Sequence, residues 1–169
     1  MPERETIERA QKDAREGKSP STQAGEFVRE EMHHIREGKH GAASTKQAIA
    51  IGLSKARRAG VKLGAPKRGT SSAQTREKAQ RDIRKGRSSG KQKTSARRSR
   101  AITGALKREG RSAASKKNLA RQARSAAKSR GAGARHQAAM KAVRTKGEAG
   151  LKRAAQKAAH TRASHRRAA

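Results

Sequence analysis

Lysine and arginine are the residues of this chain whose number and spacing indicate a function. The sequence holds 45 of them against 13 aspartates and glutamates, a net charge of +32 over 169 residues. Neutralising the phosphates of a nucleic acid releases condensed counterions, and this drives binding without reading any base. Solubility needs a net charge of only roughly 2–8. The excess therefore predicts a polyanionic partner, and nucleic acid is the expected one.

The basic residues are concentrated after residue 38. Residues 1–37 hold nine acids and seven bases, a net of −2, whereas residues 38–169 hold four acids and 38 bases, a net of +34. We expect phosphate contacts to begin near Lys39, and we expect sequence-nonspecific binding with DNA favoured over RNA. The backbone N–H groups at the helix starts Ser44 and Ser115 are further phosphate donors. The side chains expected to bind nucleic acid are Lys46, Lys55, Arg57, Arg58, Lys62, Lys67, Arg68, Arg97, Arg98, Arg100, Lys107, Arg108, Lys116, Lys117, Arg121, Arg124, Lys152, Arg153, Arg166 and Arg167.

Two other modes of nucleic-acid recognition can be compared with this one. A sequence-specific helix-turn-helix would use Lys46, Gln47 and Lys55 to reach base edges. The turn before these residues is longer than the usual three or four residues, which favours a plain helical hairpin. Stacking of single-stranded bases uses aromatic side chains, and the one aromatic residue of this chain, Phe27, is expected in the core.

Metal binding and catalysis have little support in the sequence. Glu30 and His34, and likewise His33 and Glu37, are four residues apart on an expected helix, but adjacent histidines point to different helix faces. Together with His40 they are expected to be solvated, and no metal or other cofactor is predicted. The chain has no cysteine, no phosphate-binding loop and no convergent carboxylates, so it is not expected to be an enzyme.

The elements that carry these residues are expected to be α-helices around a small core. The chain has 18 large apolar residues, nine of which lie between Phe27 and Leu63. Val28, Met32 and Ile35 have the spacing of one helix face, which predicts a helix over residues 25–37.

Glycines and a serine cap mark the ends of the expected hairpin. Gly38 ends the first helix. The run Ser44-Thr-Lys-Gln47 has the spacing of a capping box and starts the second helix. Gly60 ends that helix, and the two apolar residues of the segment 61–63 are expected to fold back on the hairpin.

The chain contains an internal duplication. ERAQKDAREGKS (8–19) matches EKAQRDIRKGRS (77–88) at seven of 12 positions, and REGKHGAAS (36–44) matches REGRSAAS (108–115) with one gap. Residues of roughly 4–66 and 73–135 therefore form two copies of one helix–glycine–helix module. The second copy is more basic and has fewer large apolar residues, so we expect it to be helical but looser.

The predicted fold is all-α, with short glycine-delimited helices in two related helical-hairpin modules and a basic, partly disordered C-terminal tail. The expected parts are a charged N-terminal helix or arm (1–24), a compact hairpin (25–63), a linker (64–72), a second, more basic helical module (73–131) and a tail rich in Ala, Lys and Arg (132–169). The helix-favouring composition of the tail is broken at Gly147 and Gly150.

Residues 21–67, and above all STKQAIAIGLSKARRAG (44–60), resemble a family of small, highly basic bacterial proteins of uncharacterised function. Its members carry variants of Lys-Gln-Ala-Ile-Ala-Ile-x-Leu-Ser and are sometimes labelled DNA-binding or plasmid-stabilisation proteins. The resemblance implies a nucleic-acid partner and supplies no catalytic residue.

Two further classes remain open from the sequence. The near-neutral first 37 residues fit a protein-interaction adaptor, and the basic part also fits RNA binding. No stretch approaches 18 apolar residues, and the start MPERETIERAQKD lacks an apolar segment. We therefore expect a cytoplasmic, nucleoid-located protein with no small-molecule substrate, no secretion and no membrane span.

Overall fold

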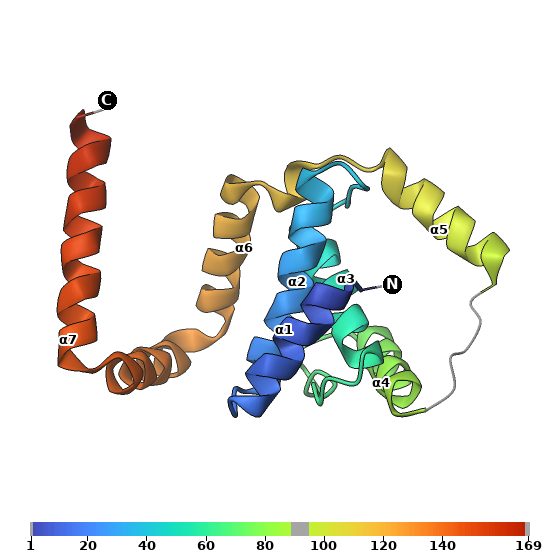
Figure 1. The fold of residues 1–169 in the computed structure, drawn as a ribbon, viewed down its shortest axis with the longest axis horizontal. Coiled ribbons are helices and arrows are strands. Elements are labelled where there is room, and N and C mark those ends of the chain that lie inside the picture. The colour runs from blue at the N-terminus through green and yellow to red at the C-terminus, as the bar shows by residue number, and fades with distance from the viewer. Residues whose placement is uncertain (1, 89–94, 168–169) are drawn as a thin grey trace. The chain divides into compact units, whose positions relative to one another are not determined.

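The structure is a computed structural model that describes residues 2–88 and 95–167, with side chains up to Arg166. All regular structure in these residues is helical, which confirms the predicted all-α class (Figure 1). The elements are α1 (Arg4–Arg15), α2 (Pro20–Arg36), α3 (Thr45–Arg58), α4 (Ala73–Arg87), α5 (Ala96–Arg108), the 3-10 turn η1 (Ser112–Ala114), α6 (Lys116–Ser129) and α7 (Gly131–Arg167). The chain divides into two compact units, residues 1–122 and 123–169.

Helix α2 starts five residues before the predicted Gly25, at Pro20. Ser19 precedes it, and its Oγ accepts a hydrogen bond from Thr22 N at 3.4 Å. Serine at the cap followed by proline in the first turn is a favoured helix start. The apolar spacing that predicted this helix covers only its later turns and so missed the cap.

Helix α3 starts at the predicted cap. Ser44 Oγ accepts a hydrogen bond from Gln47 N at 3.2 Å. Gln47 Oε1 accepts one from Ala43 N at 2.8 Å. In a standard capping box this second bond comes from the N–H of the cap residue itself, whereas here it comes from the residue before the cap. Gly38 and Gly60 follow α2 and α3 with φ of 79° and 91°, the left-handed conformation that favours glycine after a helix.

Helices α2 and α3 pack together as the predicted hairpin, with two small apolar clusters along it. At Gly52 of α3, a Cβ would lie 2.7 Å from Val28 Cα, so the glycine allows the close approach. One cluster contains Met32, Ile35, Ala42, Ala48, Ala113 and Ala114. The other contains Ala10, Ala24, Phe27 and Ala56, with Val61 and Leu63 folded back against it as predicted.

The second copy repeats the order of helices, since α4, α5 and α6 correspond to α1, α2 and α3. Ser115 Oγ accepts a hydrogen bond from Asn118 N at 3.2 Å, as Ser44 does at the start of α3. The packing differs. Among the described helices α4 packs against α3 of the first copy, no helix packs against α5, and α5 has no buried residue.

The two copies meet at their repeated loops. Gly41 N donates a hydrogen bond to Leu106 O at 2.8 Å, and Ala42 N donates one to Gly110 O at 3.2 Å. The buried Thr45 Oγ1 donates to Ala113 O at 2.6 Å. Through these bonds η1 of the second copy completes a core cluster of the first.

The second unit contains the last part of α6 and all of α7. This helix is interrupted at Gly147, where φ is 62° and ψ is 177°, as the sequence predicted. The predicted break at Gly150 is wrong, because the helix continues through this residue. No side chain of residues 123–166 is buried. None of the helices in the described part of the chain is long and apolar enough to cross a membrane.

Candidate nucleic-acid interface

The acidic side chains of the first copy are engaged by neighbouring bases. Arg9 binds both Glu5 and Glu26, with Nε 2.7 Å from Glu26 Oε2. Lys18 Nζ lies 2.7 Å from Asp13 Oδ1. The more exposed of these pairs add little stability, but all of them neutralise charge. The surface of α1 and α2 therefore offers few unpaired charges to a partner.

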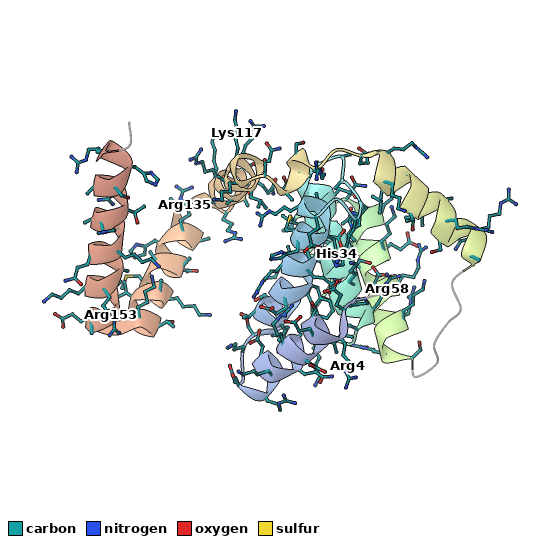
Figure 2. All side chains as sticks on the ribbon, turned by 45° about the horizontal axis from the view of Figure 1, so that its top comes forward. Arg4, His34, Arg58, Lys117, Arg135 and Arg153 are labelled. Carbon is teal, nitrogen blue, oxygen red and sulfur yellow. The ribbon has the colours of Figure 1, made fainter. Side chains whose placement is uncertain are left out.

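The bases that the structure describes after Arg81 have no such partners. Residues 84–169 hold 27 lysines and arginines and two acids. Every ion pair within 4.0 Å in the described part of the chain involves bases up to Arg81 and none after it. Figure 2 shows side chains such as Lys117 and Arg153 extending outward from their helices. The positive charge of the described residues in this region is thus exposed and forms no ion pair.

Most of the side chains predicted to bind nucleic acid are exposed. The side chain of Arg167 lies outside the described residues. The exposed residues are Lys46, Arg58, Lys62, Lys67, Arg68, Arg97, Arg98, Arg100, Lys107, Arg108, Lys116, Lys117, Arg121, Arg124, Lys152, Arg153 and Arg166.

Lys55 and Arg57 are the exceptions. Lys55 Nζ lies 2.7 Å from Glu31 Oε2, and its side chain is 14% exposed. Arg57 is 8% exposed, and its Nη2 donates a hydrogen bond to Gly64 O at 3.3 Å. Neither side chain is exposed to solvent as the other predicted side chains are, because α3 packs between α2 and α4. The same packing removes Lys55 from the set of base-reading residues.

A pocket of about 290 Å³ brings bases together from three segments of the first unit. Arg57 comes from the end of α3, Lys62 from the segment after it, and Arg87 from the end of α4. Arg57 Nε is buried without a hydrogen-bond partner among the described residues. Burial lowers the pKa of Arg57, and the charge of Asp82 opposes this shift. A buried donor without an acceptor is costly.

Arg87 is a member of this pocket that the sequence reasoning missed. A Cβ at the preceding Gly86 would collide with the carbonyl oxygen of Arg57. The glycine therefore lets the end of α4 approach the end of α3 and brings Arg87 to the pocket. The sequence signal was a glycine within a helical segment, which often marks a close contact.

The first unit also contains a buried cluster of acids and histidines. The side chains of Glu30 and Glu31 are 1% and 0% exposed, and those of His34 and His40 are 12% and 16% exposed. The two imidazoles meet edge to face with their centres 6.1 Å apart. The expectation that these two histidines are solvated is wrong, because the loop after α2 brings His40 back to that helix.

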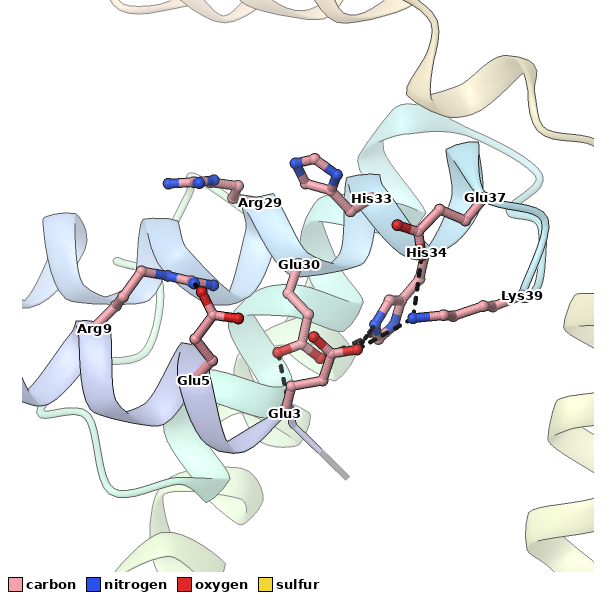
Figure 3. Close-up of a pocket in the computed structure, with 9 residues that line it drawn as sticks. All are labelled: Glu3, Glu5, Arg9, Arg29, Glu30, His33, His34, Glu37 and Lys39. Carbon is pink, nitrogen blue, oxygen red and sulfur yellow. Dashed lines mark hydrogen bonds and ion pairs between the residues drawn. The ribbon is translucent and has the colours of Figure 1, made fainter.

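Glu3 closes one side of this cluster from the N-terminal end of α1. Its Oε1 lies 2.8 Å from His34 Nε2 and 3.2 Å from Lys39 Nζ. The hydrogen bond with His34, and then the one from Lys39, lowers the pKa of Glu3. The three side chains meet at the wall of a pocket of about 210 Å³, shown in Figure 3.

Comparison with known proteins gives one relationship. Searches of curated proteins and of solved structures found no match. Residues 15–68, which include α2, α3 and the Lys-Gln-Ala-Ile-Ala-Ile run, match the model of a family of unknown function, DUF6496, and this confirms an uncharacterised family for that part of the chain.

Proposed function

We propose that this protein binds nucleic acid through the phosphate backbone without sequence preference, with double-stranded DNA as the favoured ligand, and acts as a histone-like, nucleoid-associated protein. The separation of charge supports this proposal most strongly. The acids of the first copy are paired within the chain, whereas the 27 bases of residues 84–169 face two acids and none that the structure describes forms an ion pair.

Helix α5 illustrates how such a surface meets phosphates. It carries five bases and no acid, and none of its side chains is buried. Duplex DNA has one negative charge per roughly 1.7 Å of its axis, so an exposed basic helix of this kind finds phosphates at any position along the duplex. Each contact releases counterions, and no base edge is needed.

The pocket around Arg57 adds one defined phosphate-binding site to the nonspecific attraction of the exposed bases. Lys62 and Arg87 line it at exposed positions, and the largely buried Arg57 adds a third positive charge to its wall. A single phosphate held there orients the first unit on the backbone, because phosphate contacts position a protein without specifying sequence.

Double-stranded DNA is favoured over single strands because of the missing aromatic surface. Phe27 is the one aromatic residue of the chain, and it is 1% exposed in the core. Single-strand binding usually relies on stacking worth about 1–3 kcal/mol per base. No aromatic side chain is available here for that contact.

The direct test is fluorescence anisotropy with random-sequence duplex DNA, single-stranded DNA and structured RNA at 50–200 mM salt. With roughly 6–10 phosphate contacts, the affinity for duplex DNA drops about 10³–10⁵-fold over this range. Salt-insensitive binding, or strong preference for one operator, contradicts the proposal. Tighter binding of RNA than of duplex DNA at every salt concentration would identify RNA, and not DNA, as the favoured ligand.

A paired variant tests the pocket. Lys62→Gln combined with Arg87→Gln removes two bases of the pocket and should lower the slope of log K against log salt by about one for each lost phosphate contact. Arg4→Gln is the control, since Arg4 is a 93% exposed base paired with Glu8 in the acid-rich region. Equal slopes for wild type, control and double variant would exclude the pocket from the interface.

A further inference from the structure

We infer that Glu31, His34 and His40 form a binding site for a divalent transition-metal ion of the zinc class. Each residue offers one ligand atom, and these atoms lie within 4.8 Å of one another. Two imidazoles and one carboxylate are a donor set that zinc uses in proteins, with a fourth position left for water or another ligand. This site is separate from the proposed phosphate contacts.

The buried carboxylate of Glu31 indicates that a cation belongs here. Neither of its oxygens accepts a hydrogen bond among the described residues, and its side chain is 0% exposed. Lys55 Nζ lies 2.7 Å from Oε2 as an ion pair, whereas Oε1 lies 3.4 Å from His40 Nε2. A buried carboxylate oxygen without a partner is costly, and a metal ion bound at Oε1 would remove that cost.

The two histidines are held as metal-binding histidines usually are. His40 Nδ1 lies 3.0 Å from Gly41 O, so it donates its proton there and leaves the lone pair on Nε2, the atom near Glu31. His34 Nε2 donates to Glu3 Oε1 at 2.8 Å, which leaves the lone pair on Nδ1. A hydrogen bond from the second ring nitrogen to a carbonyl or carboxylate fixes the tautomer and increases the basicity of the coordinating nitrogen.

The ion would join four segments of the first unit. Glu31 and His34 lie on α2 and His40 in the loop after it, while Glu3 at the start of α1 and Lys55 on α3 contact the ligands directly. This part of the chain has two small apolar clusters, and small domains with little core commonly gain stability from a structural metal. We therefore expect the bound ion to stabilise the folded first unit, whatever occupies its fourth position.

The test uses the full-length, metal-free protein titrated with ZnCl₂, and with CoCl₂ as a spectroscopic probe. We expect one tightly bound ion per chain, visible absorption of tetrahedral cobalt, and a rise in Tm of roughly 10 °C at a free zinc concentration of about 100 times Kd. His40→Gln should abolish the bound ion and the Tm shift while the helical circular dichroism is retained.

His33→Gln is the matched control, because His33 is an exposed neighbour of His34 on the same helix and is not part of the cluster. It should bind one ion with unchanged affinity. The three histidines of the C-terminal part remain in both variants, so weak binding there cannot explain a difference. Equal zinc binding by wild type and His40→Gln, or no stoichiometric ion in either, would overturn the inference.

Lys55→Met provides a second test that does not remove a ligand. Its ammonium lies 3.3 Å from Glu30 Oε1 and 2.7 Å from Glu31 Oε2 and repels a cation bound beside it. Loss of this charge should raise zinc affinity at least about tenfold, and zinc should restore any Tm that the variant loses. Unchanged or weaker zinc binding by Lys55→Met contradicts the site.

Discussion

The two copies of the module share an order of helices and differ in what those helices pack against. Ala10 of α1 and Ala79 of α4 occupy the same position of the repeat, and both are buried, at 5% and 4% exposure. Helix α1 packs against α2 of its own copy, whereas α4 packs against α3 of the other copy. The same face of the repeated helix thus packs within its own copy in α1 and against the other copy in α4.

The central helices explain this difference. When the copies are aligned on their shared Arg-Glu-Gly, the positions of Phe27, Met32 and Ile35 in α2 hold Ser99, Gly104 and Lys107 in α5. Helix α5 therefore lacks the large apolar side chains that bury α2, and it carries more positive charge. The two copies thus differ in role, since the first supplies most of the core and the second supplies most of the exposed bases.

The largest expected difference between the copies is in core substitutions. Ile35→Ala should lower the free energy of unfolding by about 2–5 kcal/mol, because it removes a fully buried side chain and leaves a cavity. Ile102→Ala on α5, where the residue is 55% exposed, should change it by less than about 0.5 kcal/mol. Urea denaturation followed by circular dichroism measures both. Similar losses in the two variants would contradict the assigned division.

The repeated glycines at positions 17 and 86 sharpen the comparison, because each is required for a different reason. Gly86→Ala should cost about 1–3 kcal/mol, since its Cβ meets the carbonyl of Arg57 and must displace α4. Gly17→Ala should lower the free energy of unfolding by about 1–2 kcal/mol, because the φ of 69° at this position is unfavourable for alanine. Only the first should also weaken protection of α3 amides in hydrogen exchange. Gly25→Ala, with open space around it, is the control.

Loss of a hydrogen bond between the two copies should lower the free energy of unfolding by a smaller amount. Thr45→Val removes the hydroxyl that donates to Ala113 O and leaves a buried carbonyl without its partner, which costs about 1–2 kcal/mol. Thr145 lies on α7, and its exposed hydroxyl donates a hydrogen bond to a carbonyl oxygen of the same helix. Thr145→Val should therefore leave the free energy of unfolding almost unchanged. Thermal unfolding of the two variants measures the difference, and equal Tm values would show that the Thr45 hydroxyl does not stabilise the contact between the copies.

Removal of α7 should have the smallest effect on stability. A chain that ends at Arg130 loses no buried side chain of the described residues, so its free energy of unfolding should change by less than about 0.5 kcal/mol. Its affinity for duplex DNA should nevertheless become less salt-dependent, because phosphate contacts are lost. A large loss of stability on this truncation would mean that α7 supports the core.

Local features of the fold were predictable from the sequence. The stripe of Val28, Met32 and Ile35, the cap at Ser44 and the glycine after each hairpin helix act between near neighbours, so spacing reveals them. The start of α2 was missed because its cap precedes the apolar stripe. The contacts of α4 and η1 were missed because they rest on alanines far apart in sequence, which carry little signal beside larger apolar residues.

The candidate site was predictable only in part. Exposed clusters such as Arg97 and Arg98 follow from composition, because a charged side chain is exposed unless something pairs with it. Lys55 and Arg57 differ from them only through the helices that cover α3, which no local pattern shows. The convergence of His34 and His40 likewise depends on the path of the loop between them.

The bond between Thr45 and Ala113 spans 68 residues, and this has a consequence during synthesis. At about 5–20 residues per second, a ribosome releases the second loop roughly 3 to 14 s after the first. The apolar cluster of α2 and α3 stays open to water throughout that interval, and it closes when η1 emerges. The nascent chain therefore exposes part of this cluster for a period that translation speed determines, and the cluster is completed only once Ala113 and Ala114 have been made.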